Sequence, residues 1–517
     1  MNLSELIRSL PVRIHSGDCL REVGGITDDS RQVRAGDLFV ARGGGTTDGR
    51  RFIQDAVKHG AVAVLTDRVV EAGGAAVLLT DEVGGAGVEL ARRLHGDPAA
   101  RLKLIGVTGT NGKTTTTYMV RHLLAAVGIR CGVIGTVEID TGTKPRPSDL
   151  TTPGAIELIG LLGEMVANGC RVCVMEVSSH ALDQGRARGL HFAVAAFTNL
   201  TGDHLDYHKT MDAYAAAKAR LFESLEASSL AVVNADDPAS TRMLRDCKAR
   251  RLSYGESATA ECHTIVHEVT ARHTDCSFDG PWGNLRVKLP LIGRHNVANM
   301  AAALGCVYGL GVDISQLRDA IEQCPQAPGR LERVTIAGSR SLVAAATDPG
   351  LRADERGPGS RSDPATSTFD VFVDYAHTDD ALSNVLRALR PLTPGKLRVM
   401  FGCGGDRDAT KRPRMARVAC ELADEVVITS DNPRTEDPKK IIADIRAGVP
   451  KGTNGRVAVV EDRAAAIERV LTDAQAGDVV LLAGKGHEDY QIIGNEKRPF
   501  DDRRIAAAIM DRLMSPK

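Results

Sequence analysis

The stretch GVTGTNGKT, residues 106–114, constrains the fold of this chain more than any other. It follows a short apolar run, residues 102–107, that is typical of a buried strand, and it precedes a helical pattern over residues 115–127. A glycine-rich turn between strand and helix points backbone N–H groups and the positive helix end at an anion. Lys113 adds a cation for the β- and γ-phosphates, and the Thr114 hydroxyl can ligate Mg²⁺. The stretch therefore predicts a phosphate site, although its glycine spacing is not the standard one and a plain Gly/Thr-rich turn is the alternative.

Length and composition narrow the class of protein. A chain of 517 residues is too long for one core, and its length predicts about three domains. Lys and Arg total 65 against 66 Asp and Glu, and this net charge of −1 gives no support for a nucleic-acid or membrane-surface partner. Aromatic residues make up 3% and glycines number 52, which suits an α/β enzyme with many tight turns. We therefore expect small-molecule partners that are recognised locally.

The N-terminal sequence and the cysteines give no sign of export, membrane insertion or metal binding. The first residues lack an apolar signal core, and no run reaches the ~18 apolar residues of a spanning helix, so we expect a cytoplasmic protein without membrane insertion.

The 11 cysteines show no ligand-like repeat. The one close pair, Cys170 and Cys173, opens an apolar strand pattern, which favours core residues over a redox or zinc site.

Strands and helices alternate after the phosphate loop, which predicts a doubly wound, mainly parallel sheet. Ligands of such sheets gather at the carboxyl ends of the strands. The predicted strand over residues 172–177 ends near Glu176, and the strand over 194–197 leads into a turn with Asp203 and His204. A solvated turn is the alternative, but this position favours metal and phosphate contacts.

A second group of polar loops lies in the last third of the chain. Predicted strands over residues 371–373 and 397–401 lead into polar loops, and two more such loops follow at 430–437 and 483–489. They indicate a second ligand site on a second α/β sheet. The run over residues 347–368 is rich in Gly, Ser, Pro and Asp, and we expect a surface insertion without an assigned role.

Five motifs, taken together and in this order, resemble the Mur ligases of peptidoglycan synthesis over nearly the whole chain. They are GTNGKTT (109–115), EVSSH (176–180), TNLxxDHLDYH (198–208), DYAHT (374–378) and DNPR (431–434). The resemblance implies an ATP-dependent, amide-bond-forming ligase of cell-wall biosynthesis, and hence of cell shape and division. In the reaction it implies, the D-Glu γ-carboxylate of UDP-N-acetylmuramoyl-L-alanyl-D-glutamate becomes an acyl phosphate and is attacked by the amine of meso-diaminopimelate.

The resemblance also implies an architecture. We expect a small N-terminal α/β domain for the UDP substrate (1–98), a central ATP-binding domain with a P-loop-type, mainly parallel sheet (99–330), and a C-terminal Rossmann-like α/β domain for the amino acid (331–517). ATP and Mg²⁺ are the implied cofactors, and a monomer is expected. Lys218 takes its role only from the resemblance, because pattern alone makes a lysine on the predicted helix 211–225 a solvated surface charge.

The resemblance carries over to individual positions. Those implied in catalysis are Lys113, Glu176, His204 and Lys218. Those implied as Mg²⁺ ligands are Thr114, Glu176, His204 and, once carbamylated by CO₂, Lys218. Those implied in ATP binding are Gly109, Thr110, Asn111, Gly112, Lys113, Thr114, Thr115, His295, Asn296, Arg330, Asp374 and Tyr375. Without the resemblance, Asn296 is explained equally well as a helix cap.

Two further sets concern the other substrates. The UDP-substrate positions are Ser30, Thr151, Thr152, Ser178, Ser179, Gln184 and Arg186. The diaminopimelate positions are Arg407, Asp431, Asn432, Pro433, Arg434, Gly484 and Glu488. Arg434 favours diaminopimelate over lysine as the amino-acid substrate. A guanidinium can form bidentate hydrogen bonds with the second carboxylate, which diaminopimelate has and lysine lacks.

Two departures from the family pattern stand out. Gly45 replaces a larger uracil-contacting residue, and Asp379 replaces a proline after DYAHT. The alternatives are a lysine-adding Mur ligase or a folylpolyglutamate synthase-like ligase and, from a different class, a non-catalytic nucleotide-binding protein. The last alternative predicts lost catalytic groups, yet all of the implied catalytic residues are present.

Overall fold

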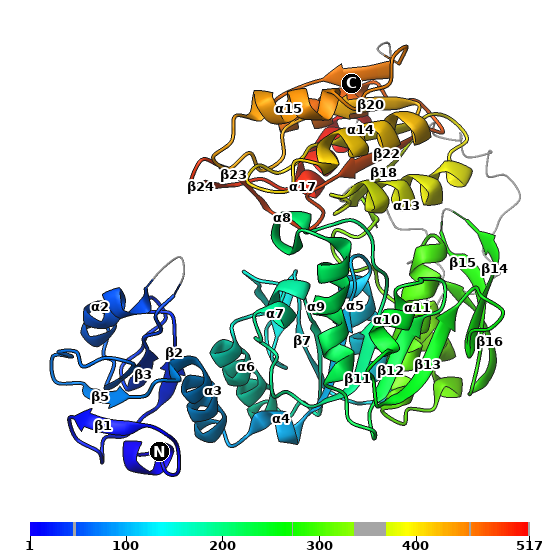
Figure 1. Cartoon of the computed structure of the whole chain (residues 1–517). Helices are drawn as coiled ribbons and strands as arrows, with labels where there is room; N and C mark the ends of the chain where they lie inside the picture. The colour runs from blue at the N-terminus through cyan, green and yellow to red at the C-terminus, as the bar shows by residue number, and fades with distance from the viewer. Residues whose placement is uncertain (45–47, 271, 336–368, 454–455, 515–517) are drawn as a thin grey trace, which may run out of the picture.

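The computed structural model describes residues 1–44, 48–270, 272–335, 369–453 and 456–514 (Figure 1). Gly45 and the run 347–368 fall outside these ranges. In the described part the strands form three large sheets, which follow one another along the chain, and one separate hairpin. The chain is thus α/β, as predicted.

The first sheet has five strands in the order β1-β5-β4-β3-β2. Three of them, β3 (Asp37–Val40), β4 (Ala63–Thr66) and β5 (Ala76–Leu79), pair in parallel and are buried at every position. Such apolar runs suit a parallel sheet that is covered on both faces. The remaining elements of this part are α1 (Leu3–Leu6), β1 (Arg13–Ser16), β2 (Gly25–Thr27), η1 (Gly49–Phe52), α2 (Ile53–Lys58) and α3 (Val83–Leu94).

The central sheet has 11 strands in the order β16-β15-β14-β13-β12-β11-β6-β10-β7-β8-β9. Its strands are β6 (Lys103–Thr108), β7 (Cys131–Ile134), β8 (Glu138–Asp140), β9 (Arg146–Pro147), β10 (Val172–Glu176), β11 (Phe192–Phe197), β12 (Leu230–Asn234), β13 (Arg250–Gly255), β14 (Cys262–Val269), β15 (Thr274–Gly280) and β16 (Gly283–Leu289). Every pair from β7 through β14 is parallel, whereas both outer ends of the sheet are antiparallel. The mainly parallel sheet is confirmed, with antiparallel margins that the strand pattern did not predict.

Helices connect these central strands. They are α4 (Pro98–Arg101), α5 (Lys113–Ala126), α6 (Ala155–Ala167), α7 (Ser179–Asp183), α8 (Leu205–His208), α9 (Met211–Glu223), α10 (Ser240–Leu244), α11 (Arg294–Gly309), η2 (Ile314–Leu317) and α12 (Arg318–Glu322). Because β6, β10 and β11 are adjacent and parallel, the loops that follow them open at one edge of the sheet.

The third sheet has the order β17-β18-β22-β19-β20-β21, and all of its pairs except β17·β18 are parallel. Its strands are β17 (Glu332–Arg333), β18 (Asp370–Asp374), β19 (Leu397–Phe401), β20 (Glu425–Ile428), β21 (Val457–Val459) and β22 (Val479–Ala483). The helices here are α13 (Asp379–Leu389), η4 (Arg390–Leu392), α14 (Lys411–Leu422), α15 (Pro438–Arg446), α16 (Arg463–Thr472) and α17 (Asp502–Met514), and β23 (Tyr490–Ile493) pairs with β24 (Glu496–Pro499) in the hairpin. Figure 1 shows the first sheet and the third sheet on different sides of the central one.

The described residues form no helix that is both long and apolar enough to cross a membrane. All 11 cysteines are free. Cys173 is fully buried, and burial raises the pKa of its thiol well above the usual range, so it behaves as a core residue.

Candidate active site

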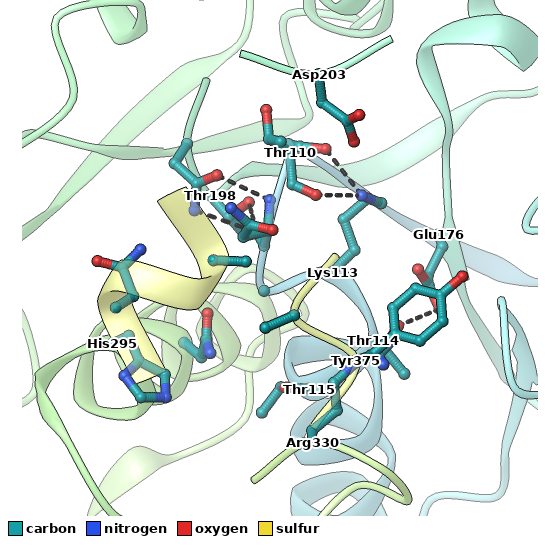
Figure 2. Close-up of a pocket in the computed structure, with 18 of the residues that line it drawn as sticks. Thr110, Lys113, Thr114, Thr115, Glu176, Thr198, Asp203, His295, Arg330 and Tyr375 are labelled. Carbon is teal, nitrogen blue, oxygen red and sulfur yellow. Dashed lines mark hydrogen bonds between the residues drawn. The ribbon is translucent and has the colours of Figure 1, made fainter. Parts of the chain in front are cut away.

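The phosphate loop connects β6 to α5 and carries Thr110, Lys113 and Thr114 (Figure 2). The close approach of neighbouring groups explains its glycines. Gly112 is the N-cap of α5 with φ 88°, and a Cβ there would lie 2.3 Å from Asn299 Oδ1. A Cβ on Gly109 would lie 1.8 Å from Thr198 Oγ1. Only glycine fits either position, so the backbone of this loop is fixed by contacts on both sides.

The turn after β11 holds the tip of the phosphate loop. Asn199 Oδ1 accepts a hydrogen bond from the Asn111 N–H at 2.9 Å, and Asn199 Nδ2 donates to the Asn111 carbonyl at 3.2 Å. Thr198 Oγ1 donates to the same carbonyl at 2.6 Å. Side chains of the turn after β11 therefore fix the backbone of the phosphate loop before any ligand binds.

Two lysines donate hydrogen bonds to backbone carbonyls of the phosphate loop. Lys113 Nζ donates to the carbonyls of Gly109 and Thr110, at 2.9 and 2.8 Å, and Lys218 Nζ donates to Gly109 at 2.8 Å. Lys218 is 1% exposed and lies on the buried face of α9, not on its solvated face as the pattern alone suggests. Burial lowers the pKa of both ammonium groups, and the Lys113 charge lowers that of Lys218 further.

Glu176 ends β10 beside Thr114. Thr114 Oγ1 donates to Glu176 Oε1 at 2.9 Å, and Thr136 donates to the same carboxylate from its backbone N–H (2.8 Å) and its hydroxyl (3.0 Å). Arg330 NH2 donates to Thr114 Oγ1 at 3.1 Å. A buried carboxylate and a hydroxyl in contact are hard oxygen donors, which suit Mg²⁺.

His204 lies apart from this oxygen pair. Its backbone is left-handed, with φ 56°, and its Nε2 lies 3.4 Å from Asp203 Oδ2. Partial burial lowers the pKa of the His204 ring, so it is neutral at pH 7 and its nitrogen can act as a ligand. Within the described ranges, no group of three or more His, Cys, Asp and Glu side chains could hold a metal ion by itself.

The opposite end of the site is formed by α11. Gly293 is the N-cap of this helix, so the explanation of Asn296 as a cap is wrong. Asn296 lies in the first turn, donates from Nδ2 to the Ile292 carbonyl at 2.9 Å, and accepts from Asn299 Nδ2 at 3.3 Å. Burial lowers the pKa of the neighbouring His295 to about 4.

Arg330 and the end of β18 close the site. The Arg330 guanidinium lies 4.4 Å from the centre of the Tyr375 ring, a cation–π contact. Asp374 accepts from the backbone N–H groups of Leu331 (2.5 Å) and Ala376 (2.7 Å), and burial raises the pKa of its carboxyl to about 6. The bond from Leu331 ties the end of β18 to the segment that carries Arg330, and the bond from Ala376 fixes the loop that follows β18.

One cavity of about 340 Å³ collects the residues of the predicted ATP site. All 12 predicted ATP-binding residues line it, and so do Glu176, His204 and Lys218. The structure thus brings together positions that are far apart in the chain.

A second cavity, of about 560 Å³, lies at the strand ends of the third sheet. Of the predicted diaminopimelate residues, Pro433 is buried and does not line the cavity. The others line it: Arg407, Asp431, Asn432, Arg434, Gly484 and Glu488. The two cavities share six lining residues: Thr136, Thr151, Asp203, His204, Tyr375 and His377. We call these six residues the junction.

Lys485, which the sequence did not single out, organises the wall of the second cavity. It is 0% exposed and donates to Asn432 Oδ1 (3.0 Å), Glu488 Oε2 (3.3 Å) and the Tyr490 carbonyl (2.6 Å). Its Nζ also lies 3.5 Å from Asp431 Oδ1. The GKGHE sequence at 484–488 puts Lys485 in the loop that begins at the end of β22, and this position in the sequence was the signal that could have identified it.

The predicted UDP-substrate residues divide into three groups. Thr151, Ser178 and Ser179 line the first cavity. Thr152, Gln184 and Arg186 do not line it but are joined by hydrogen bonds, in which Arg186 donates to the Thr152 carbonyl (2.7 Å) and to Gln184 Oε1 (2.6 Å). Ser30 follows β2 in the first sheet and lines neither cavity.

Comparison with known proteins gives consistent matches. Residues 22–89 match the model of the Mur ligase family catalytic domain, residues 107–307 the Mur ligase middle domain, and residues 361–486 the Mur ligase glutamate ligase domain. The UDP-N-acetylmuramoyl-L-alanyl-D-glutamate–2,6-diaminopimelate ligase of Synechococcus elongatus is 43% identical over 98% of this chain and 98% of its own. The ligase of the same name from Trichormus variabilis is 41% identical over 95% of this chain and 94% of its own.

Solved structures agree with these matches. A structure of a ligase of the same name is 33% identical and covers 100% of both chains with a TM-score of 0.62. MurF from Acinetobacter baumannii, at 19% identity and a TM-score of 0.70 over 93% of this chain and 95% of its own, shows a shared fold alone. On the family models and the near full-length relatives, the chain belongs to the Mur ligase family.

Proposed function

We propose that this chain joins meso-diaminopimelate to the D-Glu γ-carboxylate of UDP-N-acetylmuramoyl-L-alanyl-D-glutamate at the expense of ATP. The observation that carries the proposal is the junction, where a cavity lined by the phosphate loop meets a cavity lined by the DNPR residues. A two-step ligation needs such a meeting point, because the acid activated on one side must be reached by the amine from the other.

The proposed reaction has two chemical steps. A γ-carboxylate oxygen attacks the γ-phosphorus of ATP, the bond to ADP breaks, and an acyl phosphate forms. The neutral amine then attacks the acyl carbon, and collapse of the tetrahedral intermediate releases inorganic phosphate and a proton. Lys113 and Arg330 act in the first step, because their charges face the phosphate loop and reduce the repulsion between two anions.

Mg²⁺ belongs to the proposal. Thr114 and Glu176 fit it as oxygen donors, and His204 and carbamylated Lys218 are the further ligands that the resemblance implies. When bound, the ion supplies positive charge to the phosphate oxygens. The lowered pKa of Lys218 supports carbamylation, because only a neutral amine attacks CO₂.

Chemical rescue tests the role of Lys218. We expect Lys218→Ala to lose activity and to regain part of it with acetate or formate, which restore a carboxylate in the vacated space. Lys248→Ala, a change of an exposed lysine, is the control and should not respond to either acid. An inactive Lys218→Ala enzyme that is correctly folded and insensitive to both acids would argue against the carbamate.

Arg434 supports diaminopimelate over lysine. It lines the second cavity with φ 52°, and its NH1 donates to the Gly405 carbonyl at 2.7 Å, which orients the guanidinium. An oriented guanidinium can hold the distal carboxylate of diaminopimelate, a group that lysine lacks. The curated relatives named above carry the same amino acid in their names.

The proposal also assigns one substrate to each of three domains. We infer a UDP-substrate domain (1–98), an ATP domain (99–330) and an amino-acid domain (331–517), in a cytoplasmic monomer. The three successive sheets support this division.

Nucleotide turnover by the purified chain tests the function. We expect ADP release that requires both the UDP-linked dipeptide and diaminopimelate, with a product whose mass has increased by one diaminopimelate residue. Nucleotide binding without turnover would contradict the proposal and would favour a non-catalytic nucleotide-binding protein.

A further inference from the structure

Lys411 is a buried lysine without a role in the reaction proposed above. It is the first residue of α14, and only 7% of its surface is exposed. It lines the second cavity, which we call the amino-acid cavity, and we call the first one the ATP cavity. A lysine rarely reaches this degree of burial without a partner, because removing its charge from water is costly.

Among the residues that the structure describes, none forms a hydrogen bond or an ion pair with the Lys411 ammonium group. Asp408 lies three residues earlier and lines the same cavity, and its Oδ2 likewise has no hydrogen-bond partner in the described chain. Arg407 and Arg434 in the same cavity differ, since they donate to the carbonyls of Asp406 and Gly405. Lys411 therefore has hydrogen bonds to offer to a ligand.

Lys411 lies near the junction. Its side chain lines the second cavity together with Asp203 and His377, which are two residues of the junction. His377 Nε2 lies 3.9 Å from Asp203 Oδ2, and both residues line both cavities. The cation is thus near the place where the two cavities meet.

We propose that Lys411 is a further substrate-binding residue, whose ammonium group binds an anionic oxygen of the reactants at the junction. This inference rests on the proposed function. That oxygen belongs either to the phosphoryl group of the acyl phosphate or to a carboxylate of the incoming amino acid. Both are oxyanions that a buried ammonium group can bind by charge-assisted hydrogen bonds.

The test uses the full chain with Lys411→Met, which keeps the aliphatic stem and removes the charge. We expect kcat/KM for ligation of diaminopimelate to fall by about 10- to 100-fold, the size of effect typical of a lost charge-assisted hydrogen bond. Lys439→Met is the matched control, because Lys439 lies in the first turn of α15 but is exposed. The control should retain the activity of the unaltered chain.

A second acceptor separates the two sources of the oxyanion. Hydroxylamine has no carboxylate; its nitrogen attacks the acyl carbon, the bond to the phosphate oxygen breaks, and a hydroxamate and inorganic phosphate form. A comparable loss with hydroxylamine and with diaminopimelate assigns Lys411 to the phosphoryl group. A loss with diaminopimelate alone, expressed as a raised KM, assigns it to the carboxylate.

Two results would overturn the inference. One is a Lys411→Met enzyme as active as Lys439→Met with both acceptors. The other is equal loss in Lys411→Met and in the charge-preserving Lys411→Arg, with a matching fall in Tm, which would show a structural role. Failure of the unaltered chain to ligate would instead refute the proposed function, so the two failures are distinguishable.

Discussion

The two cavities hold their buried cations in different ways. In the ATP cavity, Lys113 and Lys218 donate to backbone carbonyls of the phosphate loop. In the amino-acid cavity, Lys485 lies among the side chains of Asp431, Asn432 and Glu488. The first arrangement leaves positive charge for an anionic ligand that arrives from solution, whereas the arrangement around Lys485 neutralises that cation internally and fixes the shape of a recognition surface. Lys411, which lines the amino-acid cavity, differs from Lys485 because it has no such partners in the described part of the chain.

The internal network extends behind the amino-acid cavity to a fully buried ion pair. Arg463 and Asp502 are each 0% exposed in their side chains and lie 2.6 Å apart. Arg463 also donates to the carbonyls of Ser430 and Ala483, which directly precede Asp431 and Gly484. The pair therefore holds together two of the strand ends that form the amino-acid site.

Breaking this pair should have the largest effect on stability. We expect Arg463→Met to reduce the free energy of unfolding by about 3–5 kcal/mol, because Asp502 would be left buried and unpaired. Urea unfolding measures the change. Arg469→Met, which removes an exposed arginine of the same helix, should cost less than about 1 kcal/mol, and equal costs for both variants would contradict the buried-pair account.

Removing a free charge from the ATP cavity should affect activity more than stability. We expect Lys113→Met to reduce kcat by about 10²–10³-fold, since one charged donor to the reacting phosphate is lost. Steady-state ADP release measures this reduction. Lys103→Met, at the exposed start of β6, should leave kcat unchanged. A Lys113→Met enzyme of normal kcat would separate this lysine from the phosphate chemistry.

A smaller change in the amino-acid cavity should affect recognition. Arg434→Lys keeps the charge but loses the planar, two-pronged donor, so we expect KM for diaminopimelate to rise by about 10- to 100-fold while KM for ATP is preserved. Initial-rate kinetics with each substrate varied in turn measure both constants. Arg498→Lys, on the exposed hairpin, serves as the control. A parallel rise in KM for ATP would contradict separate roles of the cavities.

The smallest expected effect is on pH dependence. Burial lowers the pKa of His295 in the ATP cavity from 6.5 to about 4. Its folded pKa is below its unfolded value, so its contribution to stability is complete above pH 6.5 and is lost as pH falls towards 4. Denaturant unfolding of His295→Asn at several pH values should therefore show a shallower loss of stability over this range. His15→Asn, on the exposed face of β1, should keep the slope of the unaltered chain, and an equal slope in His295→Asn would contradict the prediction.

Local pattern was sufficient for much of the fold. Apolar runs of four to six residues became β6, β10, β11 and β19, and the glycine-rich turn led into α5 as expected. The antiparallel strands β14, β15 and β16 were not predicted as separate strands, because exposed and buried positions mix along each of them and none is a continuous apolar run. The motifs, in turn, indicated residues that the structure collects around one pair of cavities.

Contacts between residues that are far apart in the sequence could not be predicted from the sequence pattern. Lys218 bonds to a carbonyl 109 residues away, and the helical periodicity around it gives no sign that this face is buried. Thr136 was identified only by its bonds to Glu176, and Asn199, although it lies in a quoted motif, received a role only from its bonds to Asn111. Lys485 and Lys411 likewise depend on elements packed against them, which is why burial, and not residue type, identifies them.

A competition assay tests the central claim most directly. The chain is incubated with ATP, the UDP-linked dipeptide, and meso-diaminopimelate and L-lysine at equal concentrations, and the products are identified by mass. The account predicts that the diaminopimelate product predominates. A predominant lysine product would contradict the assignment of the amino-acid cavity, and the absence of both products would contradict the proposed ligation itself.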